Sequence, residues 1–267
     1  MTSPAPRPAQ PATAPGAAPA VELRGVRKTF DGRAVLDDVD LVVAPGARVG
    51  VLGAAASGKS LLLRLLCGLI APDVGAISVL GEEVTGRREA ELGTLRRRLG
   101  VLFQSYALFD FLTVAGNVAF PLEQRGEADP ATIAAAVAQR LRAVGLAGSE
   151  ARWPSELSGG MKKRVGIARA TICAPELLLY DEPTAGLDPV TSRKIFDLLD
   201  ADQRATGATV LAVSSDVPAL LGFVDEVVFL HAGRVHHRGP VAALPDARDP
   251  VLRAFLDGEA GGAGGAP

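Results

Sequence analysis

Residues 53–60 read Gly-Ala-Ala-Ala-Ser-Gly-Lys-Ser and fit the pattern G-x-x-x-x-G-K-[ST]. The segment follows a short apolar run at residues 47–52 and opens a helical run at residues 58–70, which is the strand–loop–helix context that the pattern requires. In such a loop, backbone N–H groups and the helix N-terminus face an anion with a favourable dipole. The sequence therefore predicts a phosphate-binding loop in an α/β fold.

The individual residues of this loop have expected roles. Lys59 is expected to reach the β- and γ-phosphates of ATP as a point charge, and Ser60 to offer its hydroxyl to Mg²⁺. If Ala56 must adopt a left-handed backbone conformation, its methyl group costs about 1–2 kcal/mol, and nucleotide affinity could fall. The candidate ATP-binding residues of the loop are Gly53, Ala54, Ala55, Ala56, Ser57, Gly58, Lys59 and Ser60.

A second motif joins a buried apolar run to two carboxylates. Residues 177–180 read Leu-Leu-Leu-Tyr, and Asp181 and Glu182 follow directly. We expect Asp181 to hold Mg²⁺ through water, and Glu182 to polarise the attacking water as general base. Alone, the pair favours an acidic turn before Pro183. Together with the phosphate loop upstream, it indicates nucleotide hydrolysis.

Composition limits the class of protein. The chain has 267 residues, 48% of them hydrophobic, which suits one globular domain or a core with a subdomain. The net charge of −2 gives no basic surface for nucleic acid. No segment is long and apolar enough to predict a bilayer crossing, and residues 2–20 lack the apolar core of a signal peptide. Cys67 and Cys173 fit no metal-ligand spacing and are interpreted as packing residues in a reducing compartment.

Expected strands and helices alternate between two tails, which predicts a mainly parallel sheet covered by helices. Residues 1–20 are expected to form a disordered Pro/Ala-rich tail, and residues 258–267 a flexible Gly-rich tail. Residues 21–257 form the expected domain. It contains a P-loop core, a small antiparallel sheet at residues 21–43 with a turn at Asp31-Gly32, and a helical subdomain at about residues 105–165. The expected strands of the core are residues 47–52, 99–103, 177–180, 208–213 and 226–230. The expected helices are residues 58–70, 113–124, 130–144, those from 158 onward, and a short one at 251–256.

Taken together, the motifs resemble the ATP-binding-cassette (ABC) ATPases over roughly residues 21–245. In that family, the helix opened by Ser158-Gly159-Gly160 of one subunit faces the γ-phosphate held by the other. The resemblance therefore implies a head-to-tail homodimer that binds two ATP with Mg²⁺. A serine N-cap and two glycines suit this role, since they let backbone amides approach an anion closely. An ordinary capped helix is the alternative.

The same resemblance assigns three further residues. Gln104, after a strand, would contact Mg²⁺ and the water and link to the helical subdomain. Phe30 would stack on adenine, with an ordinary core Phe as an equal alternative. Asp188 would help to couple the two sites across the dimer.

Two positions depart from the family pattern. The family usually has Gly at the position of Ala56, and His at the position of Ser215. A serine is shorter than histidine and cannot carry charge, so we expect slow hydrolysis or a substitute group. The three histidines, His231, His236 and His237, are interpreted as surface or turn residues rather than as that substitute. The basic runs at residues 96–98 and 162–164 are interpreted as solvated helix faces, with weak contact to acidic permease loops or lipid headgroups as the alternative.

Residues 103–109, 154–161 and 249–258 are similar to one subgroup, the ATPase subunits of bacterial phospholipid transporters linked to MCE proteins. This resemblance implies an integral membrane permease, an MCE-domain protein and often a STAS-domain protein as partners. It places the chain peripherally on the cytoplasmic face of the inner membrane. The alternatives are the ATPase of another ABC importer or exporter, and a nucleotide-binding subunit with weak hydrolysis.

Overall fold

The computed structural model describes residues 18–105, 107–126 and 129–258. The expected tails therefore lie almost wholly outside the described residues. The described residues divide into two compact units, one formed by residues 18–89 and 224–258, and the other by the described residues between 90 and 223. Ala20 is the last residue of the tail that the sequence predicts to be disordered, and for this residue the prediction was wrong. It is buried, and its N–H donates to the Val43 carbonyl at 2.8 Å.

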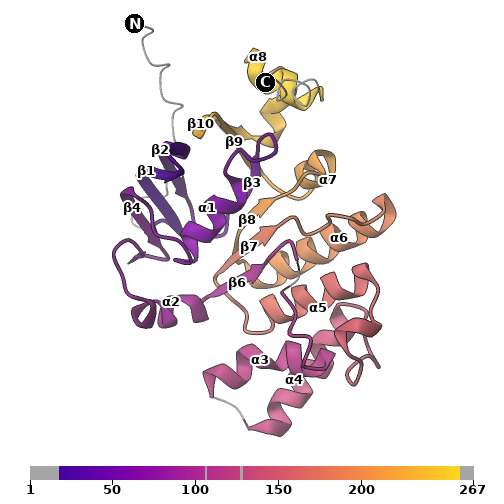
Figure 1. The fold of residues 1–267 in the computed structure, drawn as a ribbon. Helices are drawn as coiled ribbons and strands as arrows, with labels where there is room; N and C mark the ends of the chain where they lie inside the picture. The colour runs from indigo at the N-terminus through magenta and orange to yellow at the C-terminus, as the bar shows by residue number, and fades with distance from the viewer. Residues whose placement is uncertain (1–17, 106, 127–128, 259–267) are drawn as a thin grey trace, which may run out of the picture. The chain divides into compact units, whose positions relative to one another are not determined.

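The first unit contains two groups of strands (Figure 1). One is an antiparallel sheet with the order β2-β1-β4-β5, whose β1–β2 hairpin turns at Asp31 and Gly32, both with positive φ. The other runs β10-β9-β3, with β3 parallel to β9 and β10 antiparallel to it. The elements are β1 (Val21–Phe30), β2 (Arg33–Val43), β3 (Arg48–Leu52), α1 (Lys59–Leu66), β4 (Val74–Val79), β5 (Glu82–Glu83), β9 (Glu226–His231), β10 (Arg234–Pro240), η3 (Val241–Asp246) and α8 (Pro250–Leu256).

The second unit contains three parallel strands in the order β8-β7-β6 and most of the helices. Every residue of β7 and β8 is buried, as expected for strands covered on both faces. The elements are α2 (Gly93–Arg97), β6 (Leu99–Leu102), α3 (Val114–Arg125), α4 (Pro130–Ala143), η2 (Pro154–Glu156), α5 (Gly159–Thr171), β7 (Leu177–Asp181), α6 (Pro189–Thr206), β8 (Thr209–Val213) and α7 (Val217–Leu221), and η1 (Glu89–Glu91) lies at the boundary.

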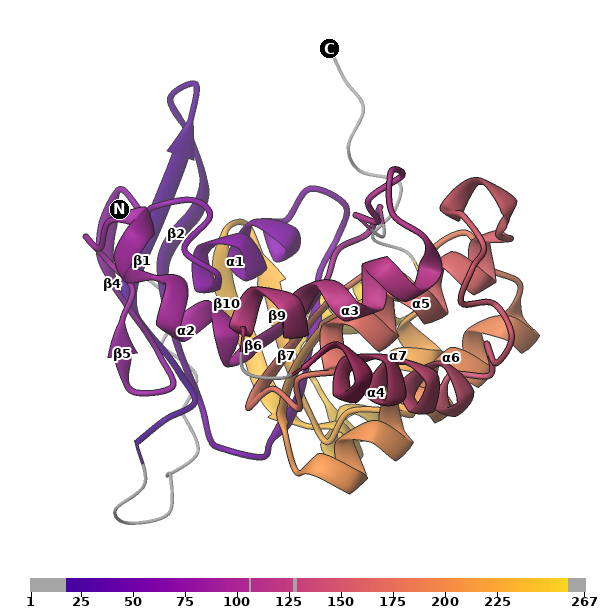
Figure 2. The ribbon, with the colours of Figure 1, turned by 90° about the horizontal axis from the view of Figure 1, so that it is seen from below.

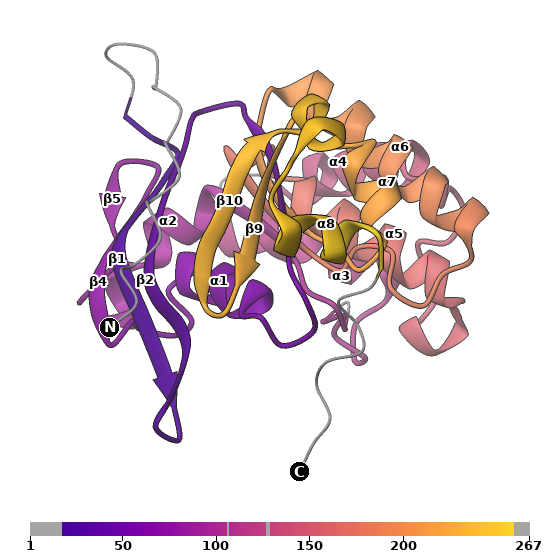
Figure 3. The same ribbon diagram turned by 90° about the horizontal axis from the view of Figure 1, so that it is seen from above.

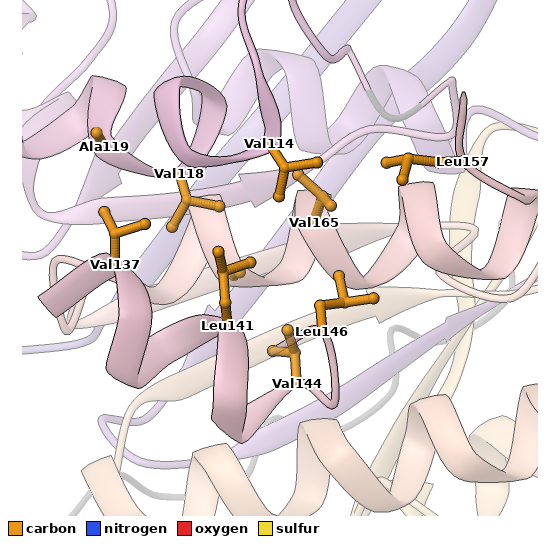
Figure 4. Close-up of a cluster of buried hydrophobic side chains, with 10 residues drawn as sticks. Val114, Val118, Ala119, Val137, Leu141, Val144, Leu146, Leu157 and Val165 are labelled. Carbon is orange, nitrogen blue, oxygen red and sulfur yellow. The ribbon is translucent and has the colours of Figure 1, made fainter. Parts of the chain in front are cut away.

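Helices α3, α4 and α5 share a core of their own within the second unit (Figure 2). Side chains from all three helices and their connections point into it (Figure 4). Val118 of α3, Leu141 of α4 and Val165 of α5 are fully buried there. The chain enters α3 through Thr113, whose side chain accepts the Gly116 N–H, and α4 through Asp129 followed by Pro130, both favourable helix starts. This core fixes the start of α5, where the candidate signature residues lie.

The predicted α/β class is confirmed, because parallel strand pairs occur in both units with helices around them. Strands β4, β5 and β10 were not predicted. Strand β10 (Arg234–Pro240) is an edge strand with little apolar alternation, and its pairing to β9 rather than its composition makes it a strand. No helix in the described part of the chain combines the length and apolarity that a bilayer crossing needs.

Helix α8 lies against β9 and β10 (Figure 3). Phe255 of α8 contacts Phe229 of β9, with ring centroids 5.0 Å apart. His236 of β10 contacts the Asp249 carboxylate at 3.0 Å, and the same carboxylate caps α8 by accepting the Leu252 N–H. The interpretation of His236 as a surface or turn residue was therefore wrong, because its half-buried ring ties β10 to the start of α8.

Candidate nucleotide-binding and hydrolysis site

The phosphate loop lies in the first unit, between β3 and α1. Gly53 and Gly58 both have positive φ, and a Cβ on either would meet a neighbouring atom at less than 3.0 Å. Only glycine fits at these two positions. Gly58 is the N-cap of α1 and makes no side-chain cap bond, because glycine has no side chain. The loop thus has the backbone of an anion cradle.

Polar groups inside this loop fit a phosphate ligand. The Lys59 ammonium donates to the carbonyls of Gly53 and Ala54, both at 2.8 Å, so the charge lies within the loop. The Ser57 hydroxyl is buried and has no hydrogen-bond partner within the described residues. An unsatisfied buried hydroxyl is uncommon and is consistent with a bound polar group.

The backbone of Ala56 is left-handed, with a φ of 59°. This is the conformation for which the sequence analysis gave the cost of a methyl group. The methyl group is exposed and meets open solvent, so the cost arises from the backbone rather than from a clash with neighbours. For a residue with a Cβ this conformation costs about 1–2 kcal/mol.

The two carboxylates follow β7 in the second unit. Asp181 is the last residue of β7, pairs with Val213 of β8 and is 3% exposed. Glu182 has φ of 54°, an uncommon conformation for a residue with a side chain, which costs about 1–3 kcal/mol and occurs preferentially at functional sites. Its N–H donates to the Val213 carbonyl at 2.9 Å. The conformation turns the chain sharply after the strand.

Ser215 contacts the Glu182 carboxylate directly. Its backbone N–H and its hydroxyl both donate to Glu182 Oε2 at 2.9 Å. The two residues are brought together because they follow the neighbouring parallel strands β7 and β8. Two donors on one oxygen fix the position of the carboxylate, and a general base must be held in place against the water that it deprotonates.

The signature residues form the exposed N-terminus of α5. Ser158 is the N-cap, and its hydroxyl accepts the Met161 N–H at 3.3 Å. Ser158 and Gly159 are exposed and Gly160 is half-buried. A Cβ on Gly160 would come within 3.3 Å of the Thr191 methyl, so glycine also allows close packing onto α6. The helix tip thus presents backbone amides to solvent.

Lys163 was grouped with solvated basic residues from the sequence, and the structure shows that this was wrong. Its side chain is fully buried, and Nζ donates to the Glu182 carbonyl at 2.7 Å and, with longer geometry, to the Gln104 carbonyl at 3.4 Å. Helical periodicity was the signal that was missed, since Lys163 lies three and four residues before the buried Gly166 and Ile167.

The remaining candidate residues are exposed. Phe30 is 45% exposed at the end of β1, with Lys28 Nζ 5.5 Å from its ring centroid, so it is not a core residue. Gln104 follows β6 with its side chain exposed. Asp188 is the exposed N-cap of α6 and accepts the Thr191 N–H at 3.0 Å. Hydrogen bonds from Thr191 hold the pKa of Asp188 below its usual value.

The structure brings Glu182, Ser215 and Lys163 together in the second unit, and the phosphate loop is complete within the first. The candidate Mg²⁺ ligands are the Ser60 hydroxyl, the Gln104 amide oxygen and the Asp181 carboxylate. All three are the hard oxygen donors that Mg²⁺ prefers, so the donor set fits this ion. Fold and site together define a P-loop nucleotide-binding protein.

Comparisons with known proteins identify the family. The family model described as "ABC transporter" matches residues 36–185. The chain is 39% identical over 242 residues to the intermembrane phospholipid transport system ATP-binding protein MlaF of Escherichia coli (strain K12), covering 91% of this chain and 90% of that protein. The chain belongs to the ABC transporter ATPase family and is an ABC ATPase subunit.

Other similarities extend across the family. The chain is 39% identical to the chloroplastic protein TRIGALACTOSYLDIACYLGLYCEROL 3 of Arabidopsis thaliana, over 91% of this chain and 74% of that one. It is 40% identical to the methionine import ATP-binding protein MetN of Corynebacterium efficiens, over 83% of this chain and 63% of that one. Among solved structures, the dimeric bacterial ABC transporter cassette MJ0796 has a TM-score of 0.78 at 30% identity, covering 83% of this chain and 98% of the cassette. The same cassette has been solved in a post-hydrolysis state with ADP and Pi.

Proposed function

We propose that this chain is the ATPase subunit of a bacterial transporter that moves phospholipid across the cell envelope, acting as a head-to-tail homodimer on the cytoplasmic face of the inner membrane. The observation that carries this proposal is the similarity to MlaF, which extends over nine-tenths of both chains. Its partners would be an integral membrane permease, an MCE-domain protein and a STAS-domain protein.

The chemistry follows from the residues of the two units. The phosphate loop with Lys59 binds the β- and γ-phosphates, and Phe30 offers an exposed ring to adenine. Glu182, whose carboxylate is held in place by the Ser215 hydroxyl, accepts the proton of the attacking water. Mg²⁺, held by Ser60, Gln104 and Asp181, would neutralise charge that develops on the phosphate oxygens.

The exposed N-terminus of α5 supports the proposal of a head-to-tail homodimer. Its amides face solvent, and the solved relative with the same fold is a dimer. We propose that Ser158, Gly159 and Gly160 of each copy complete the ATP site of the other, and that Asp188 helps to couple the two sites.

A groove in the second unit supports the proposal that the chain binds a permease. It encloses about 510 Å³, and its lining combines apolar and cationic side chains and includes Phe103, the residue before Gln104. Such a groove suits a short amphipathic helix with acidic ends. The apolar lining residues include Leu99, Val101, Phe103, Phe109 and Phe120, and the cationic ones are Arg96, Arg97, Arg125 and Arg169.

Hydrolysis is tested by phosphate release from the purified full-length chain compared with its Glu182→Gln variant. The amide cannot accept the proton, so we expect turnover to fall by about 100-fold or more with ATP still bound. Equal rates for the two proteins would leave a nucleotide-binding subunit without the proposed base.

The transported substrate is tested by purifying the tagged chain from native membranes and identifying its partners. We expect a permease together with an MCE-domain protein, and ATP-dependent transfer of labelled phospholipid by the reconstituted complex. The similarity to MetN favours a second candidate, a methionine importer. A complex whose ATPase activity responds to methionine and not to phospholipid would establish that alternative.

A further inference from the structure

Lys163 occupies an unusual environment for a lysine. It lies on α5, five residues after the exposed N-cap Ser158, and is completely buried. Its ammonium donates to the backbone carbonyl of Glu182 at 2.7 Å and to that of Gln104 at 3.4 Å. One cation therefore joins the signature helix to the two backbone segments that carry the candidate base and the candidate Mg²⁺ ligand.

Burial of this charge has a cost that the surroundings offset. Desolvation lowers the pKa of Lys163, while the charges of Glu182 and Asp181 raise it. An apolar side chain of similar length would fill the same space without a desolvation penalty. The hydrogen bonds from the ammonium to the Glu182 and Gln104 carbonyls therefore explain the presence of a lysine here better than packing does.

What it holds is the backbone of Glu182 in its left-handed conformation. The residue is fixed at three places: its N–H donates to the Val213 carbonyl, its carbonyl accepts from Lys163, and its carboxylate accepts from Ser215. A strained backbone persists only where such contacts determine it. Lys163 supplies the contact to the carbonyl on the side of α5.

We propose that Lys163 is a positioning residue for ATP hydrolysis, which aims the Glu182 carboxylate by holding the Glu182 backbone and links that backbone to Gln104 and to α5. Lys163 itself does not touch ATP. The link makes the direction of the base depend on the positions of Gln104 and of the signature helix. This proposal rests on the proposed role of Glu182 as general base.

The test compares the steady-state kinetics of the full-length Lys163→Met, Lys163→Arg and Lys162→Met variants. Lys163→Met removes the donor at similar length, and Lys163→Arg retains a cationic donor. Lys162 is the matched control, a neighbouring lysine on the same helix that is only half-buried. Lys163→Leu, which also removes the donor, serves in its place if Lys163→Met fails to fold.

We expect Lys163→Met to lower kcat by about 10- to 100-fold, while the ATP KM and the Kd of a fluorescent ATP analogue change by less than about 2-fold, because a misaimed base affects chemistry and not binding. Lys163→Arg should recover part of kcat, and Lys162→Met should match the wild type. A merely structural role would not separate kcat from KM in this way.

A folded Lys163→Met protein with wild-type kcat, or with a raised KM and unchanged kcat, would overturn the proposal. The Glu182→Gln variant is measured alongside it. If Glu182→Gln is inactive and Lys163→Met is fully active, the positioning role fails and the role of Glu182 stands. If Glu182→Gln is as active as the wild type, Glu182 is not the general base, and the proposed role of Lys163 fails with it.

Discussion

Ala56 carries a left-handed backbone conformation within the phosphate loop, at φ of 59°. Glycine adopts this conformation without the Cβ penalty of about 1–2 kcal/mol, although it loses about 0.5–1 kcal/mol more chain entropy on folding. We therefore expect Ala56→Gly to raise the free energy of unfolding by up to about 1 kcal/mol. Urea unfolding monitored by circular dichroism measures this change.

Ala55 is the matched control, because it lies in the same loop with no positive φ. Ala55→Gly should lower the free energy of unfolding by about 0.5–1 kcal/mol, since it adds only chain entropy. Equal effects of the two substitutions would show that the conformation of Ala56 carries no penalty.

Ser215 contacts the candidate base through two hydrogen bonds to one carboxylate oxygen. A histidine at this position has a longer side chain and can present a charged donor toward the phosphate. We expect Ser215→His to raise kcat several-fold, and Ser215→Ala, which keeps the backbone donor, to lower it. A folded Ser215→His protein with reduced phosphate release would contradict this account of the position.

At the scale of elements, the loop before α3 is held by one buried amide. Asn117 is fully buried, its Nδ2 donates to the carbonyls of Phe109, Leu112 and Thr113, and its Oδ1 accepts the Phe109 N–H. Asn117→Leu removes the side-chain partner of the Phe109 N–H and of the Leu112 carbonyl, whereas the Phe109 and Thr113 carbonyls still accept backbone N–H groups. Each buried group left unsatisfied costs about 1–3 kcal/mol. We expect a loss of about 3 kcal/mol or more in unfolding free energy, and faster hydrogen exchange at the Phe109 amide.

Asp110 provides the comparison within the same loop, because its side chain is exposed. Asp110→Asn should change the free energy of unfolding by less than about 0.5 kcal/mol. If Asn117→Leu is equally mild, the amide does not hold the loop.

The strands that are buried on both faces could be predicted from the sequence, whereas a half-buried edge strand could not. Strands β7 and β8 are apolar runs buried on both faces, so composition alone located them. Strand β10 is half-buried at an edge and depends on its partner β9, so local sequence contains no clear signal for it. Helices α3 and α4 were located within one or two residues, because Thr113 and Asp129-Pro130 mark their starts.

The site was predictable in its residues but not in its contacts. The motifs named Glu182 and Ser215, yet the hydrogen bonds between them join residues 33 positions apart in sequence. Nothing in the sequence indicates that Glu182 is left-handed, because that conformation depends on Val213, Ser215 and Lys163 together. Lys163 was overlooked because its charge suggested a surface position, whereas the helical period places it on the buried face.

At the scale of the whole molecule, the proposed dimer makes a prediction about mixtures of inactive chains. A Lys59→Ala chain keeps its α5 tip but lacks the charge that binds phosphate. A Ser158→Glu chain keeps its phosphate loop but places a carboxylate at the tip, where it would repel the γ-phosphate. Each variant alone should be nearly inactive.

In a mixed dimer, however, one site combines the intact loop of the Ser158→Glu chain with the intact tip of the Lys59→Ala chain. If equal amounts exchange freely and the sites act independently, half the dimers are mixed and each has one working site, which gives about a quarter of the wild-type rate. Phosphate release from the refolded or exchanged mixture measures this recovery. A tip that serves the loop of its own chain would leave every site damaged, so a mixture as inactive as its components would refute the head-to-tail arrangement.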